Sequence, residues 1–349
     1  MTAVVDRAPG AVVAPGPGLV PGFALAAAAA LALALRLPAQ TTVLGLIAFG
    51  LLHNVLELRY VLGRFATLLA GPYLVLLLTL AGGIALVRAA QLGAPGQRIE
   101  IVLGYAVLAA GLARTRRTPL ILAGAAVLAA SLTASLTWPA YHFVVLTHVH
   151  NLVPLAFLWE WSRDLRRRPT RWAFRAVQLG WVAVVPGLLL AGVLDAWAAH
   201  PPTTTGVGFA GTLASITAPC TPAAWASGPA ALRFLTAFAF LQTMHYVVWC
   251  LFVPRWGRSA TAAFEARASE PGWSWVRAVT GRRPVLIGAA AGVLVGATLI
   301  ADWRSGRTLY GSLAVVHVYL EFPVVLALLA ALAVPRTPPP APTSTRSRP

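Results

Sequence analysis

Long apolar runs recur along the whole of this chain, and they restrict the folds open to it more than any other feature. A helix of about 20 residues crosses the hydrocarbon core of a bilayer, and it satisfies its own backbone hydrogen bonds there. Ten runs approach or exceed that length: 22–37, 41–61, 65–88, 99–113, 118–138, 140–162, 173–197, 228–253, 284–303 and 308–334. They predict an all-α, polytopic transmembrane helix bundle of about ten helices.

The charged residues support this class and orient the bundle. Only 11% of residues are charged, against about 25% in soluble domains. All 27 basic residues are arginine, and 21 of them fall on one predicted side of the membrane. Positive charge marks the cytoplasmic side and meets anionic lipids there. We therefore expect a protein of the plasma membrane with both termini on the cytoplasmic side. We expect no nucleic-acid partner, because no basic soluble domain is present.

The organisation expected from composition is a single membrane domain, residues 22–334, between two disordered ends. Residues 1–21 are rich in Pro, Gly and Ala, and residues 335–349 in Pro, Ser, Thr and Arg. The first apolar run is also compatible with a signal peptide, although the segment before it carries only one arginine, offset by one aspartate. The cytoplasmic loop 254–283 is expected to lie on the membrane surface, with Trp273 and Trp275 as anchors.

Ionisable side chains inside the apolar runs are the strongest functional signal. Such groups are costly in a membrane and usually face the bundle interior. Four separate helices each bring at least one histidine to a similar depth, as a metal or haem site in a bundle requires. The candidate metal ligands are His53, Glu57, His148, His150, His245, His317 and Glu321.

Two of these helices repeat one spacing. His53 and Glu57 are four residues apart, as are His317 and Glu321, so each pair shares one helix face. A carboxylate placed one turn from a histidine can ligate the same metal or orient the imidazole. The alternative for Glu57 is an ion pair with an arginine near the inner surface, Arg59 or Arg64.

The helix over 140–162 carries His148 and His150, which are about 200° apart around an ideal helix. At least one of them is expected to be a ligand, but both cannot face one ion from a regular helix. Pro154 removes a backbone hydrogen bond and predicts a kink at this point, and Pro323 does the same near His317.

The residue types indicate the chemistry. Imidazole with carboxylate suits non-haem iron, while imidazole alone also suits copper or haem. The leading hypothesis is a membrane metalloenzyme that uses non-haem iron for O2-dependent oxidation or cleavage of a lipophilic substrate, with Tyr246 or Tyr319 donating a proton or hydrogen bond. A b-type haem electron-transfer protein and a proton-coupled transporter remain alternatives, as do purely structural histidines. Cys220 and Cys250 lie on opposite predicted sides and form no disulfide.

The segment HNVLE, residues 53–57, resembles the His-Gly-Ala-Leu-Asp type motif of the Brp/Blh family, the membrane-bound bacterial beta-carotene dioxygenases. This resemblance implies a multi-helix iron enzyme that cleaves a carotenoid. It carries over His53 and Glu57, and more loosely His148 or His150, His245 and His317. The segment departs from the motif at Asn54, Val55 and Glu57, and the likeness covers short pieces of about half the chain.

Overall fold

The computed structural model of the protein describes residues 18–115, 118–198, 212–274 and 282–332, and within these ranges it contains helices and no strand. The long helices are α1 (Leu19–Arg36), α2 (Pro38–Arg64), α3 (Gly71–Ala89), α4 (Gly93–Ala113), α5 (Thr118–Thr137), α6 (Pro139–Leu152), α8 (Arg168–Leu179), α11 (Pro229–Tyr246), α15 (Arg282–Ala301) and α16 (Trp303–Leu332). The shorter ones are α7 (Pro154–Trp161), α9 (Val185–Leu190), α10 (Leu213–Thr217), α12 (Val253–Trp256) and α13 (Arg258–Arg267).

The predicted all-α membrane bundle is confirmed. Nine helical segments of the described chain are long and apolar enough to cross a membrane. The remaining predicted run, 284–303, is helix α15, whose apolar part, Val285–Ala301, is shorter than the others. The ends 1–17 and 333–349 lie outside the described residues, and so does Trp275.

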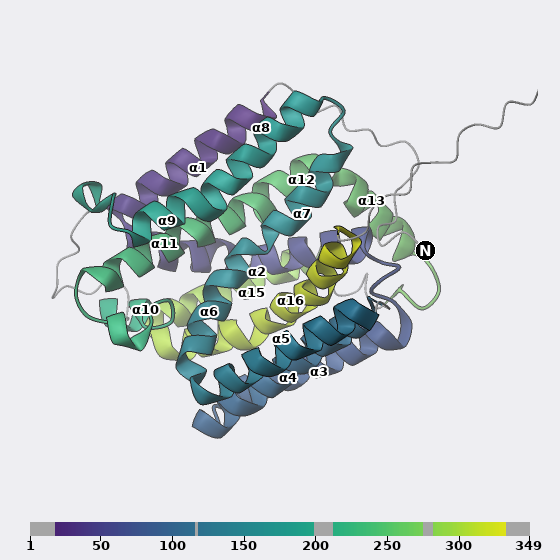
Figure 1. Ribbon diagram of the computed structural model, residues 1–349, viewed down its shortest axis with the longest axis horizontal. Coiled ribbons are helices and arrows are strands. Elements are labelled where there is room, and N and C mark those ends of the chain that lie inside the picture. The colour runs from purple at the N-terminus through teal and green to yellow at the C-terminus, as the bar shows by residue number, and fades with distance from the viewer. Residues whose placement is uncertain (1–17, 116–117, 199–211, 275–281, 333–349) are drawn as a thin grey trace, which may run out of the picture.

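The centre of the bundle is built around α2 and α16. Helix α2 contacts α11, α15 and α16, while α16 also contacts α3 and α4. Helices α3, α4 and α5 form a layer on one side, and α1 and α8 lie side by side on the other (Figure 1). Helices α6 and α7 cross between these two sides, so the middle of the bundle is enclosed by helices that are far apart in sequence.

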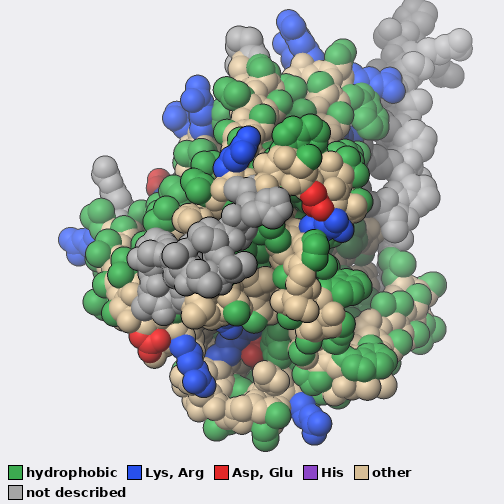
Figure 2. Space-filling view, turned by 90° about the vertical axis from the view of Figure 1, so that its left-hand side faces the viewer, with side chains coloured by type: hydrophobic (Ala, Val, Ile, Leu, Met, Phe, Trp, Pro, Cys, Tyr) green, Lys and Arg blue, Asp and Glu red, His purple; other side chains and the backbone are tan. Residues whose placement is uncertain are grey.

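The surface and interior are reversed relative to a soluble protein. Large apolar side chains such as Leu86 and Val293 are 73% and 74% exposed, and α5 buries none of its residues. By contrast, several polar residues of α2, α11 and α16 are buried. The face in Figure 2 carries few charged side chains scattered among hydrophobic ones, and no described histidine reaches it. This distribution is expected of a bundle surrounded by lipid.

Irregular backbone interrupts the helices near the centre. Helix α6 ends at Leu152 and α7 begins at Pro154, which confirms the predicted break after His150. A π-helical turn over Val247–Phe252 follows α11 directly, ahead of Pro254, whereas Pro323 stays inside α16. Such turns occur often at functional sites, where they re-aim neighbouring side chains.

The cytoplasmic loop predicted over 254–283 contains a helix, α13, that packs on α2. Phe264 and Ala260 are buried, and a methyl group on Gly63 of α2 would lie 2.2 Å from the Ala260 carbonyl oxygen. Trp273 is partly buried beside the Arg267 guanidinium. The described part of this loop is therefore held against the protein by side-chain packing.

Candidate metal centre

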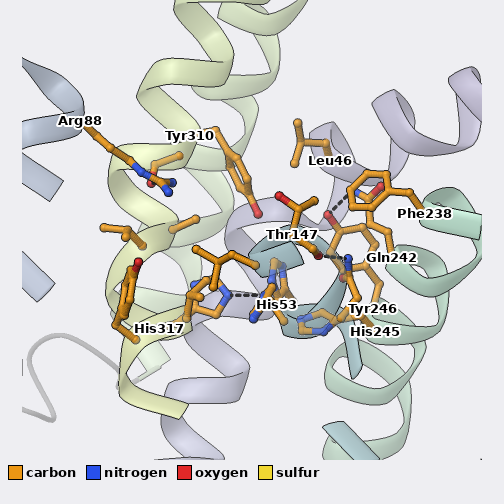
Figure 3. Close-up of a pocket in the computed structure, with 18 residues that line it drawn as sticks. Leu46, His53, Arg88, Thr147, Phe238, Gln242, His245, Tyr246, Tyr310 and His317 are labelled. Atoms are coloured by element: carbon orange, nitrogen blue, oxygen red, sulfur yellow. Dashed lines mark hydrogen bonds between the residues drawn. The ribbon is translucent and has the colours of Figure 1, made fainter. Parts of the chain in front are cut away.

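Four histidines from four different helices meet in the middle of the bundle. Helix α2 supplies His53, α6 supplies His150, α11 supplies His245 and α16 supplies His317. One ring nitrogen from each lies within 4.8 Å of those of the others. Figure 3 shows His53, His245 and His317 converging from three directions. The structure thus brings together one predicted histidine from each of the four helices.

Hydrogen bonds at the Nδ1 atoms orient two of these rings. His53 Nδ1 lies 2.9 Å from the Phe49 carbonyl oxygen, one turn earlier on α2. His150 Nδ1 lies 2.9 Å from Glu321 Oε2. When Nδ1–H donates to these acceptors, each Nε2 carries a free lone pair. This is the arrangement by which a carbonyl or carboxylate fixes a metal-binding imidazole.

The Nε2 atoms of His150 and His317 have a spacing that suits two ligands of one metal ion, and both ring nitrogens of His245 are without a hydrogen-bond partner among the described residues. His317 Nε2 lies 3.3 Å from His150 Nε2, the contact drawn as a dashed line in Figure 3. Two nitrogens held at 2.0–2.1 Å from one tetrahedral ion are about 3.4 Å apart. His245 is 1% exposed, and neither of its ring nitrogens has a hydrogen-bond partner among the described residues. A cation among the four rings would satisfy these buried nitrogens.

Glu57 and Glu321 place two carboxyl groups directly beside the histidines. Both residues are 0% exposed, and their carboxyl groups are close enough to interact with each other. Glu57 Oε2 lies 3.7 Å from His245 Nε2, and no described donor reaches either Glu57 oxygen. A buried carboxylate without a partner is costly, so this pair also favours a cation nearby.

The alternative ion pair for Glu57 is not formed. Arg59 contacts Glu265 on α13, and Arg64 contacts Glu160 on α7. Both arginines are therefore occupied by carboxylates from other helices. Glu57 is left facing the histidines, on the side of α2 that the i,i+4 spacing with His53 predicted.

His148 does not join the four-histidine group. Its Nε2 lies 2.8 Å from the Cys220 carbonyl oxygen, and its ring packs against Phe234 and Phe238. The 200° separation from His150 explains this placement, because α6 remains helical through both residues. Burial raises the pKa of the Cys220 thiol to about 12, so this cysteine stays protonated and is a poor ligand.

The two tyrosines proposed for proton or hydrogen-bond donation line the same cavity. The Tyr246 ring centroid is 4.8 Å from that of His53, and its Oη accepts a hydrogen bond of 2.8 Å from Gln242 Nε2. Tyr319 is 3% exposed, and its Oη has no hydrogen-bond partner in the described part of the chain. Both hydroxyl groups therefore have a proton available to donate.

A cavity of about 170 Å³ extends from the histidines to Arg88 (Figure 3). Arg88 lies at the end opposite the histidines, and Tyr310 points its hydroxyl into the space between. Leu146, Phe238 and Val318 contribute apolar wall. The metal candidate thus lies at the bottom of a largely apolar chamber inside the membrane domain.

The polar residues of this region that were not predicted as site residues include Arg88, Glu100 and Tyr310. Arg88 on α3 forms a partly buried ion pair with Glu100 on α4. The sequence does contain a sign of Glu100, because an acidic residue inside the apolar run 99–113 is unusual. Both charges lie near predicted helix ends, where charged residues are ordinary, and Tyr310 lies early in its run.

The fold and the site define a class: an all-α, multi-pass membrane protein with a buried group of four histidines able to hold a metal ion. Comparison with known proteins adds no narrower assignment. No family model, no curated protein and no solved structure matches the chain. The resemblance of residues 53–57 to the Brp/Blh motif therefore stays a prediction.

Proposed function

We propose that this protein is an integral membrane metalloenzyme that binds non-haem iron and carries out O2-dependent oxidation or cleavage of a lipophilic substrate. The observation that carries the proposal is the convergence of four histidines, three of them buried and His150 partly buried, with two buried carboxyl groups beside them. The plasma membrane is the expected location, because the arginine distribution predicts an ordinary cytoplasmic side.

Charge balance supports a divalent cation. Four neutral imidazoles together with the ionised forms of Glu57 and Glu321 would carry a charge of −2, which a divalent cation would balance. In a low-dielectric interior that charge is strongly unfavourable without a counter-ion. Histidine with carboxylate is also the donor set that non-haem iron prefers, and copper is the next candidate for a site rich in imidazole.

The chain's own groups have separable roles in this proposal. His53, His150, His245 and His317 would hold iron, which supplies the capacity to react with O2. Glu321 orients His150, and Glu57 balances charge or completes the ligand set. Tyr246 and Tyr319 hold protons at the cavity wall. In a dioxygenase reaction both oxygen atoms enter the products and the substrate supplies the electrons, so no separate reductant is required.

The position of the cavity supports a lipophilic substrate. The cavity lies within the membrane-spanning helices α2, α6, α11 and α16, and its walls are largely apolar. A substrate dissolved in the bilayer can reach it laterally, without crossing an aqueous phase. The Brp/Blh resemblance, which rests on His53 and Glu57, supports the same class of membrane iron enzyme.

The geometry disfavours a b-type haem. Axial ligation needs the macrocycle to lie between two imidazoles, yet His317 Nε2 and His150 Nε2 are only 3.3 Å apart, and ligand atoms of all four histidines lie within 4.8 Å of one another. The cavity of about 170 Å³ is close to the engineered 150 Å³ cavity in another protein that binds benzene. A porphyrin is several times larger than benzene.

The decisive test is the metal content per chain of detergent-purified protein, beside His245→Ala and the control His148→Ala. We expect about one equivalent of iron in the wild type and in His148→Ala, and loss of iron in His245→Ala. Absence of any bound transition metal, even after reconstitution with iron or copper, would contradict the proposal and favour a proton-coupled carrier, which proton uptake in liposomes would then reveal.

A further inference from the structure

Arg88 lies at the end of the cavity opposite the histidines and forms an ion pair with Glu100. Arg88 donates through Nε to Glu100 Oε1 at 2.8 Å and through Nη2 to the same oxygen. Its Nη1 donates to the Gly311 carbonyl oxygen at 3.3 Å. A guanidinium has five N–H groups, so three are used and two remain. The charge of Arg88 is balanced, but its donor capacity is not exhausted.

A tyrosine hydroxyl adds a second unused donor at this end. Tyr319 and Arg88 line the same cavity, and no group in the described chain forms a hydrogen bond with Tyr319 Oη. Its ring is held in place by α4, where a methyl group on Gly104 would lie 2.7 Å from a Tyr319 ring carbon. A buried hydroxyl held this firmly without a partner is ready to bind a ligand oxygen.

The separation of the two ends limits what the ligand can be. Gly311, which contacts Arg88, precedes His317 by six residues on α16, a rise of about 9 Å. The cavity between them holds only a few heavy atoms. A molecule anchored by an oxygen at Arg88 would therefore present a carbon several bonds away to the histidines.

We propose that Arg88, Glu100 and Tyr319 form a binding site for the neutral oxygen-bearing end, a hydroxyl or carbonyl group, of a lipophilic molecule. Glu100 already cancels the charge of Arg88, so a carboxylate would leave this buried site with net negative charge. A neutral oxygen accepts hydrogen bonds from the free N–H groups and from Tyr319 at no such cost. The role of this molecule as substrate rests on the proposed function, but its binding does not.

The site can be tested by photolabelling of the full-length, detergent-purified protein. The probes are a short-chain aliphatic alcohol that carries a diazirine beside its hydroxyl-bearing carbon, and the corresponding fatty acid. We expect the alcohol to label the segments around Arg88, Glu100 and Gly311, and excess unlabelled alcohol to compete. The fatty acid should label these segments at least about tenfold less.

Variants separate hydrogen bonding from charge. Tyr319→Phe keeps the ring and removes one donor, so labelling by the alcohol should fall about fivefold to tenfold. Glu100→Gln leaves Arg88 unbalanced and should reverse the preference toward the fatty acid. The matched control is Asp195→Asn combined with Arg233→Gln, which removes an ion pair outside the cavity and should change neither probe.

If Glu100→Gln fails to fold, the Tyr319→Phe measurement alone decides the matter, because that change preserves packing. Equal labelling by alcohol and acid in the wild type would overturn the inference. So would labelling unchanged by Tyr319→Phe, or labelling spread over lipid-facing helices such as α5.

The same measurement on His245→Ala distinguishes this inference from the proposed function. Retained labelling in His245→Ala, which is expected to bind no iron, would show that the oxygen site does not depend on the metal. Retained labelling in a wild type that binds no metal would support the oxygen site and contradict only the metalloenzyme. Loss of labelling in a wild type that does retain iron would contradict only the oxygen site.

Discussion

The central four-histidine group and the ion pairs of Arg64 are both polar clusters inside this bundle, and they differ in how their charges are balanced. Near one end, Arg64 on α2 donates to Glu160 at 2.8 Å and to Asp164 at 3.0 Å, so cation and carboxylates neutralise one another. At the centre, the four histidines stand beside Glu57 and Glu321 with no described cation among them.

The contrast separates a structural cluster from a binding site. The Arg64 cluster, formed by Arg64, Glu160 and Asp164, links α2 to α7, and its cation is paired with carboxylates of the described chain. The four-histidine group has ring nitrogens and carboxylate oxygens that are buried and unsatisfied within the described chain. Buried polar groups are nearly always paired in folded proteins, so an unpaired set marks a place for a ligand.

The largest effect is expected from removing a ligand of the central group. His317→Ala deletes the nitrogen 3.3 Å from His150, and affinity for iron should fall more than about hundredfold, beyond the loss expected for an outer partner. Thermal stabilisation by added iron should disappear with it. A variant that still binds iron as the wild type does would contradict the assignment of this histidine.

Breaking the Arg64 cluster should cost stability and leave metal binding intact. Arg64→Met strands Glu160, which is 4% exposed, and loss of one partner from a buried pair costs about 3–5 kcal/mol. Denaturant unfolding in detergent measures this change. Iron per folded molecule should equal that of the wild type, and a parallel loss of iron would show that the two clusters are coupled.

The carboxylates of the central group should have an intermediate effect. Glu321→Gln keeps the shape but weakens the acceptor for His150 Nδ1, and such partners are worth about 10–100-fold in metal affinity. Glu57→Gln should match or exceed this loss, because Glu57 has no other described cation to balance it. Competition with a chelator of known affinity provides the measurement. Equal iron affinity in all three proteins would assign both carboxylates a structural role only.

The smallest effect is expected from Asp164→Asn. The Asp164 side chain is 24% exposed, and partly exposed ion pairs contribute about 1 kcal/mol or less. Because Glu160 alone still balances Arg64, unfolding should shift only slightly and iron content should stay constant. A loss as large as that of Arg64→Met would mean that both carboxylates are needed to hold α2 against α7.

Much of this arrangement follows from the sequence. Apolar runs fix which segments cross the membrane, and depth along each helix places His53, His245 and His317 at one level. The i,i+4 spacing also places Glu57 on the face of His53, which the structure confirms. These features depend on local periodicity, and local periodicity is what a sequence records directly.

The rotation of each helix and its distant partners could not be predicted in the same way. The spacing of His148 and His150 shows that only one can face the centre, but the choice depends on how α6 packs against α11 and α16. Arg64 meets Glu160 across 96 residues of chain, and Arg88 meets Gly311 across 223. No local pattern encodes those pairs.

Three glycines that do not line the cavity nevertheless set its shape. Added methyl groups at Gly45, Gly50 and Gly104 would lie 3.1, 2.9 and 2.7 Å from ring carbons of Tyr246, Tyr310 and Tyr319, in that order. Each aromatic ring occupies the space left by a missing side chain on a neighbouring helix. Substitutions at these three positions would therefore move the tyrosine rings and change the size of the cavity. The histidines and carboxyl groups of the candidate metal site would stay the same.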